Sequence, residues 1–308
     1  MADNLDSICF FEGQYRPLKE ANINIQTHAL QYGTACFAGI RGYYNPERDN
    51  IFIFRLDEHH KRLSASAKIL QMTMPHSLDE FTEIVSEMLR RSNWKQNVYL
   101  RPFIYKSDLD LSPRLHNVGD SFAMYALGLD DYLDTQKGLS VCISSWVRLH
   151  ESQIPTRAKA NGGYINSALA KSEAMENGYD EAVFLDLKGN VSEGSASNIF
   201  IVKNGKLITP DLSSSILEGI TRKTVLELAE TLGIPAQERC LARSELYTAD
   251  EVFFSGTGVQ IPWIREVDRR VIGQGTIGPV TAQLQKLFNE IVRGQNPQYE
   301  SWLTPVYR

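Results

Sequence analysis

One polar, irregular stretch near the middle of the chain constrains the fold more than any other feature. Residues 130–138 read DDYLDTQKG and lack the apolar periodicity of the segments on either side. Before and after this stretch, short strand-like runs alternate with longer helix-like segments, a pattern typical of α/β layers. The sequence therefore predicts a mixed α/β chain of two lobes with a cleft between them. We expect a small N-terminal domain over residues 1–128, an interdomain loop over 129–138 and a larger C-terminal domain over 139–308.

Local signals support this division on both sides of the loop. Ser77 and Glu80 have the spacing of a capping box, which predicts the start of a helix. Val98 to Tyr105 alternates like a strand, although Pro102 indicates a bulge or an edge there. The Asn204-Gly205 pair suits a tight hairpin turn. Further segments predicted by the same reasoning are a strand at 51–54, helices at 56–70, 165–177 and 220–232, and a buried strand at 252–254.

Composition excludes several classes of protein. The 308 residues carry 32 Lys and Arg against 37 Asp and Glu, a net charge of −5, and 43% are hydrophobic. This is enough apolar material for a core, and the acidic balance argues against binding to nucleic acid or anionic membranes. We find no membrane-spanning run, no secretory signal and no transit peptide. Four scattered cysteines fit a reducing compartment, so we expect a soluble cytoplasmic enzyme.

Three familiar motifs do not lead to a function. Residues 273–278 fit the pattern G-x-G-x-x-G, but only 30 residues follow, and Pro297, Trp302 and Pro305 look like a tail. A dinucleotide fold needs a further strand and an acidic residue about 20 positions later, so a glycine-rich turn is the better interpretation. The six histidines form no metal-binding spacing, and we expect no metal. The α/β-hydrolase pattern G-x-S-x-G is absent around Ser195.

The second half holds four features that could serve one cofactor. Lys159 lies among small residues in a loop after a strand, as a lysine that reacts with an aldehyde would. Glu193 follows a strand and could pair with a pyridine nitrogen. The helix start at residues 219–221 and the turn at residues 255–258 offer free backbone amides to an anion. Taken singly, each feature could equally be a surface lysine, a turn carboxylate or ordinary capping.

The first half contributes cations and aromatic rings. Tyr99 and Arg101 stand at alternate positions of one predicted strand, so their side chains face the same side. An Arg beside a Tyr can hold a carboxylate in bidentate fashion. Arg62 lies midway along a predicted helix, and Tyr32 and Phe37 precede it. The alternative is a surface cation beside a half-buried ring.

Taken together, these residues resemble one family, the branched-chain amino-acid aminotransferases, which depend on pyridoxal 5′-phosphate (PLP) and have fold type IV. The resemblance covers nearly the whole chain, and the motifs occur in the order of the family. The matching strings are HALQYG at 28–33, FAGIR at 37–41, YLRP at 99–102, AKANGGY at 158–164, SEG at 192–194, GITR at 219–222 and SGT at 255–257.

The resemblance implies roles for particular residues, and a cofactor cleft between the two domains. Lys159 would bond PLP and move the proton between substrate Cα and cofactor C4′, while Glu193 would pair with the pyridine nitrogen. The other implied cofactor residues are Tyr164 at the phenolic oxygen, Leu217 on the ring face, and Arg62, Ile220, Thr221, Gly256 and Thr257 around the phosphate. The implied substrate residues are Tyr99, Thr257 and Gly258 for the α-carboxylate, Arg101, Tyr32 and Tyr132 for the glutamate side chain, and Phe37 with Tyr32 for branched side chains.

The activity implied is transamination between leucine, isoleucine or valine and 2-oxoglutarate, in a homo-oligomer that is at least a dimer and as large as a hexamer in some relatives. Ala38 stands where the family often has Glu, Gly258 where relatives often have Ala, and no Trp precedes Tyr132. These departures border the substrate pocket, so activity on D-amino acids or (R)-amines is the alternative. A lyase of the same fold fits the 32–41 string less well, a nicotinamide oxidoreductase would rest on residues 273–278 alone, and a non-catalytic binding module would make Lys159 and Glu193 coincidental.

Overall fold

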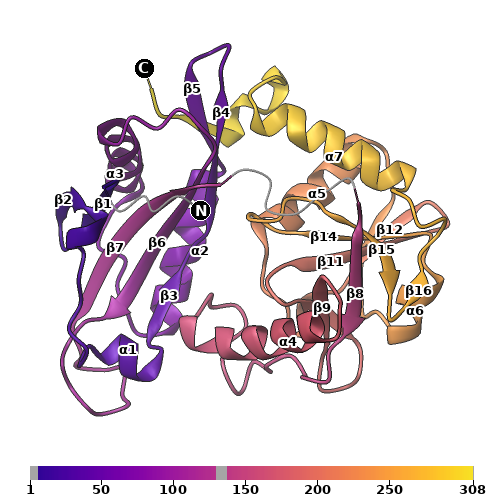
Figure 1. Cartoon of the computed structure of the whole chain (residues 1–308), viewed down its shortest axis with the longest axis horizontal. Helices are drawn as coiled ribbons and strands as arrows, with labels where there is room; N and C mark the ends of the chain where they lie inside the picture. Colours follow the sequence, from indigo (N-terminus) through magenta and orange to yellow (C-terminus); the bar gives the residue numbers. More distant parts are fainter. Residues whose placement is uncertain (1–5, 130–136, 308) are drawn as a thin grey trace. The chain divides into compact units, whose positions relative to one another are not determined.

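A computed structural model of the chain describes residues 6–129 and 137–307 (Figure 1). The chain divides into two compact units, and each is described by itself. Unit 1 comprises residues 1–130, 158–162 and 290–308, and unit 2 comprises residues 131–157 and 163–289. Two stretches that we assigned to the C-terminal domain, 158–162 and 290–308, therefore belong to unit 1. The predicted loop at 129–138 lies mostly outside the described residues, and the boundary and the cleft stay predictions.

Unit 1 is built on one eight-stranded sheet, in the order β17-β5-β4-β6-β7-β1-β2 with β3 paired to β6. Its strands are β1 (Ile8–Phe11), β2 (Gln14–Pro17), β3 (Ala35–Phe37), β4 (Ile40–Asn45), β5 (Asn50–Phe54), β6 (Val98–Lys106), β7 (Asp120–Gly128) and β17 (Leu303–Pro305). Its helices are α1 (His28–Tyr32), α2 (Leu56–Ile69) and α3 (Leu78–Arg91), with short 3₁₀ turns at Leu18–Glu20 and Pro297–Trp302.

Helices α2 and α3 cover one face of this sheet. The apolar stripe of α3 carries Phe81 and Val85, which pack with Leu63 of α2 and with Leu100 of β6. The capping box predicted at Ser77 is present, because the Ser77 hydroxyl accepts from the third amide of α3 while the Glu80 carboxylate accepts from the Ser77 amide. The local sequence thus sets where α3 begins, and its stripe decides which face it buries.

Pro102 lies in a central strand, not at an edge as one of our interpretations had it. β6 pairs with β7 along one side and with both β3 and β4 along the other. β3 and β4 are separated by Ala38 and Gly39, and Pro102 faces this break, where its carbonyl accepts from the Ala38 amide at 2.9 Å. A proline has no amide hydrogen to donate, so the interruption of the neighbouring strand is what makes room for it.

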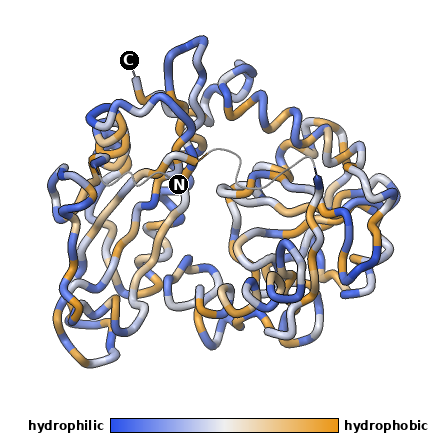
Figure 2. The backbone as a smooth tube through the Cα atoms, viewed as in Figure 1, coloured by the Kyte–Doolittle hydropathy of each residue, from blue (hydrophilic) through white to orange (hydrophobic). Residues whose placement is uncertain are grey.

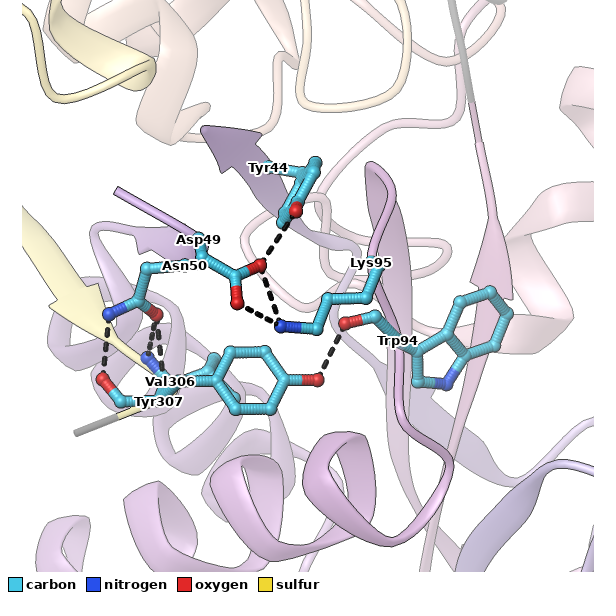
Figure 3. Close-up of polar contacts among 7 residues, drawn as sticks. All are labelled: Tyr44, Asp49, Asn50, Trp94, Lys95, Val306 and Tyr307. Carbon is cyan, nitrogen blue, oxygen red and sulfur yellow. Dashed lines mark hydrogen bonds and ion pairs between the residues drawn. The ribbon is translucent and has the colours of Figure 1, made fainter. Parts of the chain in front are cut away.

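The C-terminal segment is a strand of unit 1 and not the tail that its prolines indicated. β17 pairs antiparallel with β5. Beyond it, the Asn50 side chain accepts from the amides of Val306 and Tyr307 at 3.1 and 2.9 Å and donates to the Tyr307 carbonyl at 2.6 Å (Figure 3). The Tyr307 hydroxyl donates to the Trp94 carbonyl at 2.5 Å. The end of the chain is therefore fastened to β5 and to the segment after α3.

The same segment fixes the start of α2. Arg55 precedes this helix with φ of 50°, and its amide donates to the Trp302 carbonyl at 2.7 Å. The Arg55 guanidinium is buried and lies 3.7 Å from the centre of a Trp302 ring. A cation stacked on an indole in this way is favourable. Residues that follow along α2 inherit their position from this anchor.

Unit 2 contains a nine-stranded mixed sheet in the order β10-β9-β8-β15-β14-β11-β12-β13, with β16 paired to β15. Its strands are β8 (Leu139–Ile143), β9 (Glu181–Leu185), β10 (Val191–Gly194), β11 (Asn198–Lys203), β12 (Lys206–Thr209), β13 (Ala236–Glu238), β14 (Glu251–Ser255), β15 (Trp263–Val267) and β16 (Arg270–Val271). Its helices are α4 (Tyr164–Glu176), α5 (Ile220–Thr231), α6 (Arg243–Thr248) and α7 (Pro279–Val292), whose last residues fall in unit 1.

Both faces of this second sheet are buried, which explains its apolar strands in Figure 2. One face packs Val252 and Phe254 into a cluster with Leu246 of α6. On β14 and β11, Phe253 and Phe200 stack ring on ring at 5.0 Å. The predicted Asn204-Gly205 hairpin joins β11 to β12, and both residues have positive φ. The two sheets, each packed with helices, confirm the mixed α/β fold class.

Residues 273–278 form the turn between β16 and α7 that we predicted. α7 then begins where the buried Glu251 carboxylate accepts from the Val280 and Thr281 amides at 3.0 and 2.8 Å. A carboxylate at a helix start satisfies amides that would otherwise lack partners. Among residues 6–129 and 137–307, no helix is long and apolar enough to cross a membrane.

Candidate active site

Lys159 belongs to unit 1, although it comes from the second half of the sequence. Its carbonyl accepts from the Phe37 amide at 3.1 Å, and its amide donates to the Ser66 hydroxyl at 3.2 Å. The neighbouring Ala160 forms an isolated bridge with Cys36. The loop that carries the lysine is thus held between β3 and α2, so its backbone position is defined by long-range hydrogen bonds.

Two glycines allow this close approach. The Gly162 amide donates to the Gly33 carbonyl at 3.1 Å. Gly33 has φ of 68°, and a Cβ built there would lie 2.9 Å from the Gly162 Cα. Any other residue at position 33 would combine backbone strain with a collision against the backbone of the lysine loop. The glycine-rich sequence around Lys159 therefore has a packing reason.

Helix α2 places three polar residues near the lysine loop. His59, Arg62 and Ser66 recur at helical spacing, and the Ser66 hydroxyl also donates to the Arg62 carbonyl at 2.9 Å. His59 is buried, and its pKa lies well below the usual value because burial disfavours the charged ring and because Arg62 and Lys159 add positive charge nearby. His59 is therefore neutral, and α2 presents one buried neutral ring beside two cations.

One aromatic ring, Phe37, contacts both Lys159 and Arg101. The Lys159 amine lies 5.0 Å from the ring centre and the Arg101 guanidinium carbon lies 4.3 Å from it. Arg101 also donates to the Tyr99 hydroxyl at 3.1 Å, as expected for two residues on one side of β6. An aromatic face attracts cations, so this ring holds both positive groups within one small region of unit 1.

Arg101 is half-buried and not fully satisfied. Its Nε is buried and has no hydrogen-bond partner among the described residues. A buried donor without an acceptor costs free energy, and a carboxylate would satisfy it. Gly39 contributes to the same region, because a Cβ there would lie 2.0 Å from the Tyr99 hydroxyl oxygen. The residue before β4 must be glycine for Tyr99 to reach this position.

Two further predicted substrate residues are less informative. Tyr32 ends α1, is 37% exposed and packs its ring 4.8 Å from the ring of His28. Tyr132 lies outside the described residues. Neither placement tests a role in binding the glutamate side chain.

In unit 2, Glu193 is buried in β10 and accepts from three donors of the described chain. Arg148 lies 2.8 Å from one carboxylate oxygen. The Asn198 side chain and the Leu217 amide donate to the other oxygen at 2.9 and 3.1 Å. A buried carboxylate needs such partners, and with them it can present a fixed negative charge.

The start of α5 lies beside this carboxylate. Gly219 precedes the helix, no side chain caps it among the described residues, and Ile220 and Thr221 are buried in its first turn. The side-chain oxygen of Asn198 would lie 2.0 Å from a Cβ at Gly219, so only glycine fits. Uncapped first-turn amides are suited to an anion such as a phosphate.

The remaining predicted residues of unit 2 lie at element ends. Thr257 and Gly258 are half-exposed in a tight turn after β14, which Gly256 closes by two backbone hydrogen bonds with Gln260 at 2.9 and 2.6 Å. Tyr164 is the first residue of α4. A Cβ at Gly258 would meet nothing within 4 Å.

These donors fit PLP by their chemistry. The cofactor needs an amine, an anionic partner for a ring nitrogen and amides for a phosphate. Unit 1 supplies the amine in a fixed loop. Unit 2 supplies a buried, charge-paired carboxylate and an uncapped helix start. Sequence reasoning missed four residues that hold these groups, namely His59, Ser66, Arg148 and Asn198; helical spacing from Arg62 could have revealed the first two.

Comparison with known proteins gives the context of this site. The sequence profile of the family described as amino-transferase class IV matches residues 37–267. A probable branched-chain-amino-acid aminotransferase from Aquifex aeolicus (strain VF5) is 48% identical over 299 residues, which cover 97% of this chain and 96% of the relative.

Two solved structures are similar over nearly their full length. The branched-chain aminotransferase from the thermophilic archaeon Thermoproteus uzoniensis with norvaline is 41% identical, with a TM-score of 0.93 and coverage of 97% of this chain and 99% of that one. The branched-chain amino acid aminotransferase of T.th., complexed with N-(5′-phosphopyridoxyl)-L-glutamate, is 38% identical with a TM-score of 0.92 and coverage of 98% and 99%.

Proposed function

Because the chain belongs to the class IV aminotransferases, as a PLP-dependent branched-chain amino-acid aminotransferase, we propose that it transfers the amino group of leucine, isoleucine or valine to 2-oxoglutarate through Lys159. PLP supplies an aldehyde that reacts with amines and a ring that withdraws electrons from the substrate Cα. The Lys159 amine binds the cofactor covalently, takes the proton from the substrate Cα and returns it to C4′.

The cofactor residues follow from the two units. Glu193 holds the proton on the ring nitrogen, since it is a buried carboxylate with a charged partner. Tyr164 donates to the phenolic oxygen, and Leu217 packs on the ring face. The groups proposed for the phosphate share positive charge or free amides, and they are Arg62, Ile220, Thr221, Gly256 and Thr257.

One observation carries the proposal: the Phe37 ring contacts both the amine of Lys159 and the guanidinium of Arg101. An apolar ring suits a branched side chain, and the guanidinium suits the side-chain carboxylate of glutamate. The structure of a relative with N-(5′-phosphopyridoxyl)-L-glutamate supports glutamate as the second substrate. Arg101, with Tyr32 and Tyr132, would bind the distal carboxylate, while Tyr99 and the amides of Thr257 and Gly258 bind the α-carboxylate.

The test measures both half-reactions in single turnovers, followed by the absorbance of the bound cofactor. We expect leucine and glutamate each to convert the aldehyde form to the amine form in the natural chain. Lys159→Ala should abolish both conversions. The matched control is Lys188→Ala, a lysine in the turn between β9 and β10, which should convert both substrates at the natural rate. Conversion by leucine without any conversion by glutamate would refute 2-oxoglutarate as the acceptor.

One feature favours a second activity, on D-amino acids or (R)-amines. Gly258 leaves open space where a Cβ would meet nothing within 4 Å. Extra room beside the α-carboxylate site would admit a substrate of inverted configuration. Half-reaction rates with D-alanine and (R)-phenylethylamine decide this, and no conversion by either would exclude it.

We also propose that the protein is a cytoplasmic homo-oligomer. Large apolar side chains lie exposed on unit 1, including Ile25 at 78% and Leu30 at 58%. Such a patch supports association with other copies. All four cysteines are free, which suits a reducing compartment. Sedimentation at micromolar concentration tests the oligomer, and a monomer would contradict it.

A further inference from the structure

Arg148 forms a nearly buried ion pair with Glu193. Its guanidinium lies 2.8 Å from one carboxylate oxygen, and the two side chains are 13% and 7% exposed. Arg148 is placed by β9, because its amide donates to the Leu185 carbonyl at 2.9 Å and its guanidinium lies 5.7 Å from the Phe184 ring centre. The arginine therefore reaches the carboxylate from a neighbouring segment of the sheet.

The two other donors that bind Glu193 in unit 2 are neutral. Asn198 binds one carboxylate oxygen and also donates to the Leu217 carbonyl at 3.0 Å, and the Leu217 amide binds the same oxygen. These bonds fix the orientation of the carboxylate and tie it to the residues before α5. Only Arg148 among these three donors adds a positive charge, so the charge balance of the buried carboxylate depends on it.

We propose that Arg148 is a positioning residue that keeps Glu193 ionised, and that it thereby keeps the proton on the ring nitrogen of PLP. This inference rests on the proposed pairing of Glu193 with that nitrogen. A carboxylate and a pyridine nitrogen in contact share one proton, and the proton resides on the nitrogen only while the anion is stabilised. Burial disfavours the anion and a neighbouring cation favours it. Without Arg148 the proton moves to the Glu193 oxygen, and the nitrogen becomes neutral.

The consequence for the reaction is a weaker electron sink. A protonated ring nitrogen accepts electron density from the substrate Cα better than a neutral one. Removal of the Cα proton by Lys159 should therefore slow when Arg148 loses its charge. Each tenfold loss in rate corresponds to about one unit of proton affinity shifted between the two atoms.

The experiment follows the ring nitrogen itself. The holoenzyme is loaded with PLP carrying ¹⁵N in the ring, and its ¹⁵N chemical shift is recorded for the natural chain and for Arg148→Met, Arg148→Lys and Glu193→Gln. We expect the protonated signal in the natural chain and in Arg148→Lys. In Arg148→Met we expect the signal to move toward the neutral position, with a leucine half-reaction slower by about tenfold or more. An unchanged signal in Arg148→Met would overturn the proposal.

Two further variants separate the possible failures. If Glu193→Gln leaves the signal unchanged, the proposed pairing of Glu193 with the nitrogen fails, and the role of Arg148 fails with it. If Glu193→Gln moves the signal and Arg148→Met does not, only the role of Arg148 fails. The double variant Arg148→Met/Glu193→Gln removes both buried charges, and its signal should match that of Glu193→Gln. An additional shift in the double variant would show that Arg148 acts by another route.

A matched control tests for general loss of structure. Arg239 pairs with Glu245 at 2.6 Å in the same unit, and neither residue contributes to the proposed cofactor site. Arg239→Met should leave the ¹⁵N signal and the half-reaction rate unchanged. A change in Arg239→Met equal to that in Arg148→Met would mean that loss of any ion pair in unit 2 disturbs the nitrogen, which would overturn the specific role.

Discussion

Replacing Arg101 by methionine should separate the two substrates of this aminotransferase. Arg101 stacks on Phe37 and donates to Tyr99, and its buried Nε lacks a partner among the described residues. Methionine keeps much of the volume and the contact with the ring but removes the charge. The glutamate half-reaction should lose a charged hydrogen-bonding partner, whereas leucine has no distal carboxylate to lose.

The magnitude follows from the number and type of bonds. Hydrogen bonds to charged groups contribute about 1.5–3 kcal/mol each, so losing a guanidinium–carboxylate contact should cost about 3 kcal/mol, or about 150-fold in kcat/KM for glutamate. Leucine should lose only a cation–ring contact of about 0.5–1 kcal/mol, less than about sixfold. The glutamate loss should therefore exceed the leucine loss by about 25-fold or more.

The assay compares kcat/KM for glutamate and leucine in single half-reactions of the natural chain and Arg101→Met. Arg48→Met is the matched control, because Arg48 also lies over a phenylalanine of the same sheet, 4.5 Å from the Phe52 ring centre. This control should change neither half-reaction. Equal losses for glutamate and leucine in Arg101→Met would refute the assignment of Arg101 to the distal carboxylate.

Three other substitutions test the surroundings of the lysine loop and the substrate site. Gly33→Ala should lower the midpoint of thermal unfolding and the rate of both half-reactions, because φ there is 68° and the new Cβ would meet the lysine loop; unchanged stability would contradict this. His59 has a lowered pKa, so below about pH 6.5 the unfolded chain takes up a proton that folded His59 does not, and stability falls by up to about 1.4 kcal/mol per pH unit. His59→Met should flatten this part of the stability curve measured by denaturant unfolding, and an unchanged slope would refute it. Gly258→Ala should leave the unfolding midpoint unchanged, since the Cβ meets nothing within 4 Å, and should reduce any turnover of D-alanine; a lowered midpoint would contradict the open space.

Local sequence predicts much of this fold because its signals are short-range. The capping box at Ser77 and the Asn204-Gly205 hairpin depend on residues within one turn, and both are present. Pro102 could not be placed in the same way. Whether a proline is tolerated in a central strand depends on where the neighbouring strand is interrupted, and Ala38 and Gly39 are more than 60 positions away in sequence.

Long-range packing also explains what sequence reasoning left out of the site. Lys159 comes from the second half of the chain, but its hydrogen bonds to Phe37 and Ser66 place it in unit 1. The pairing of Arg148 with Glu193 joins two segments 45 positions apart, and no local pattern marks it. The residue types that perform chemistry could be recognised from the sequence, whereas the residues that orient them could not.

The most direct test of the central claim asks which lysine carries the cofactor. The holoenzyme is reduced with borohydride, digested and examined by mass spectrometry. We expect one phosphopyridoxyl group per chain, attached to the peptide that contains Lys159. Attachment to a different lysine, or no attachment in protein that shows the cofactor absorbance, would contradict the account.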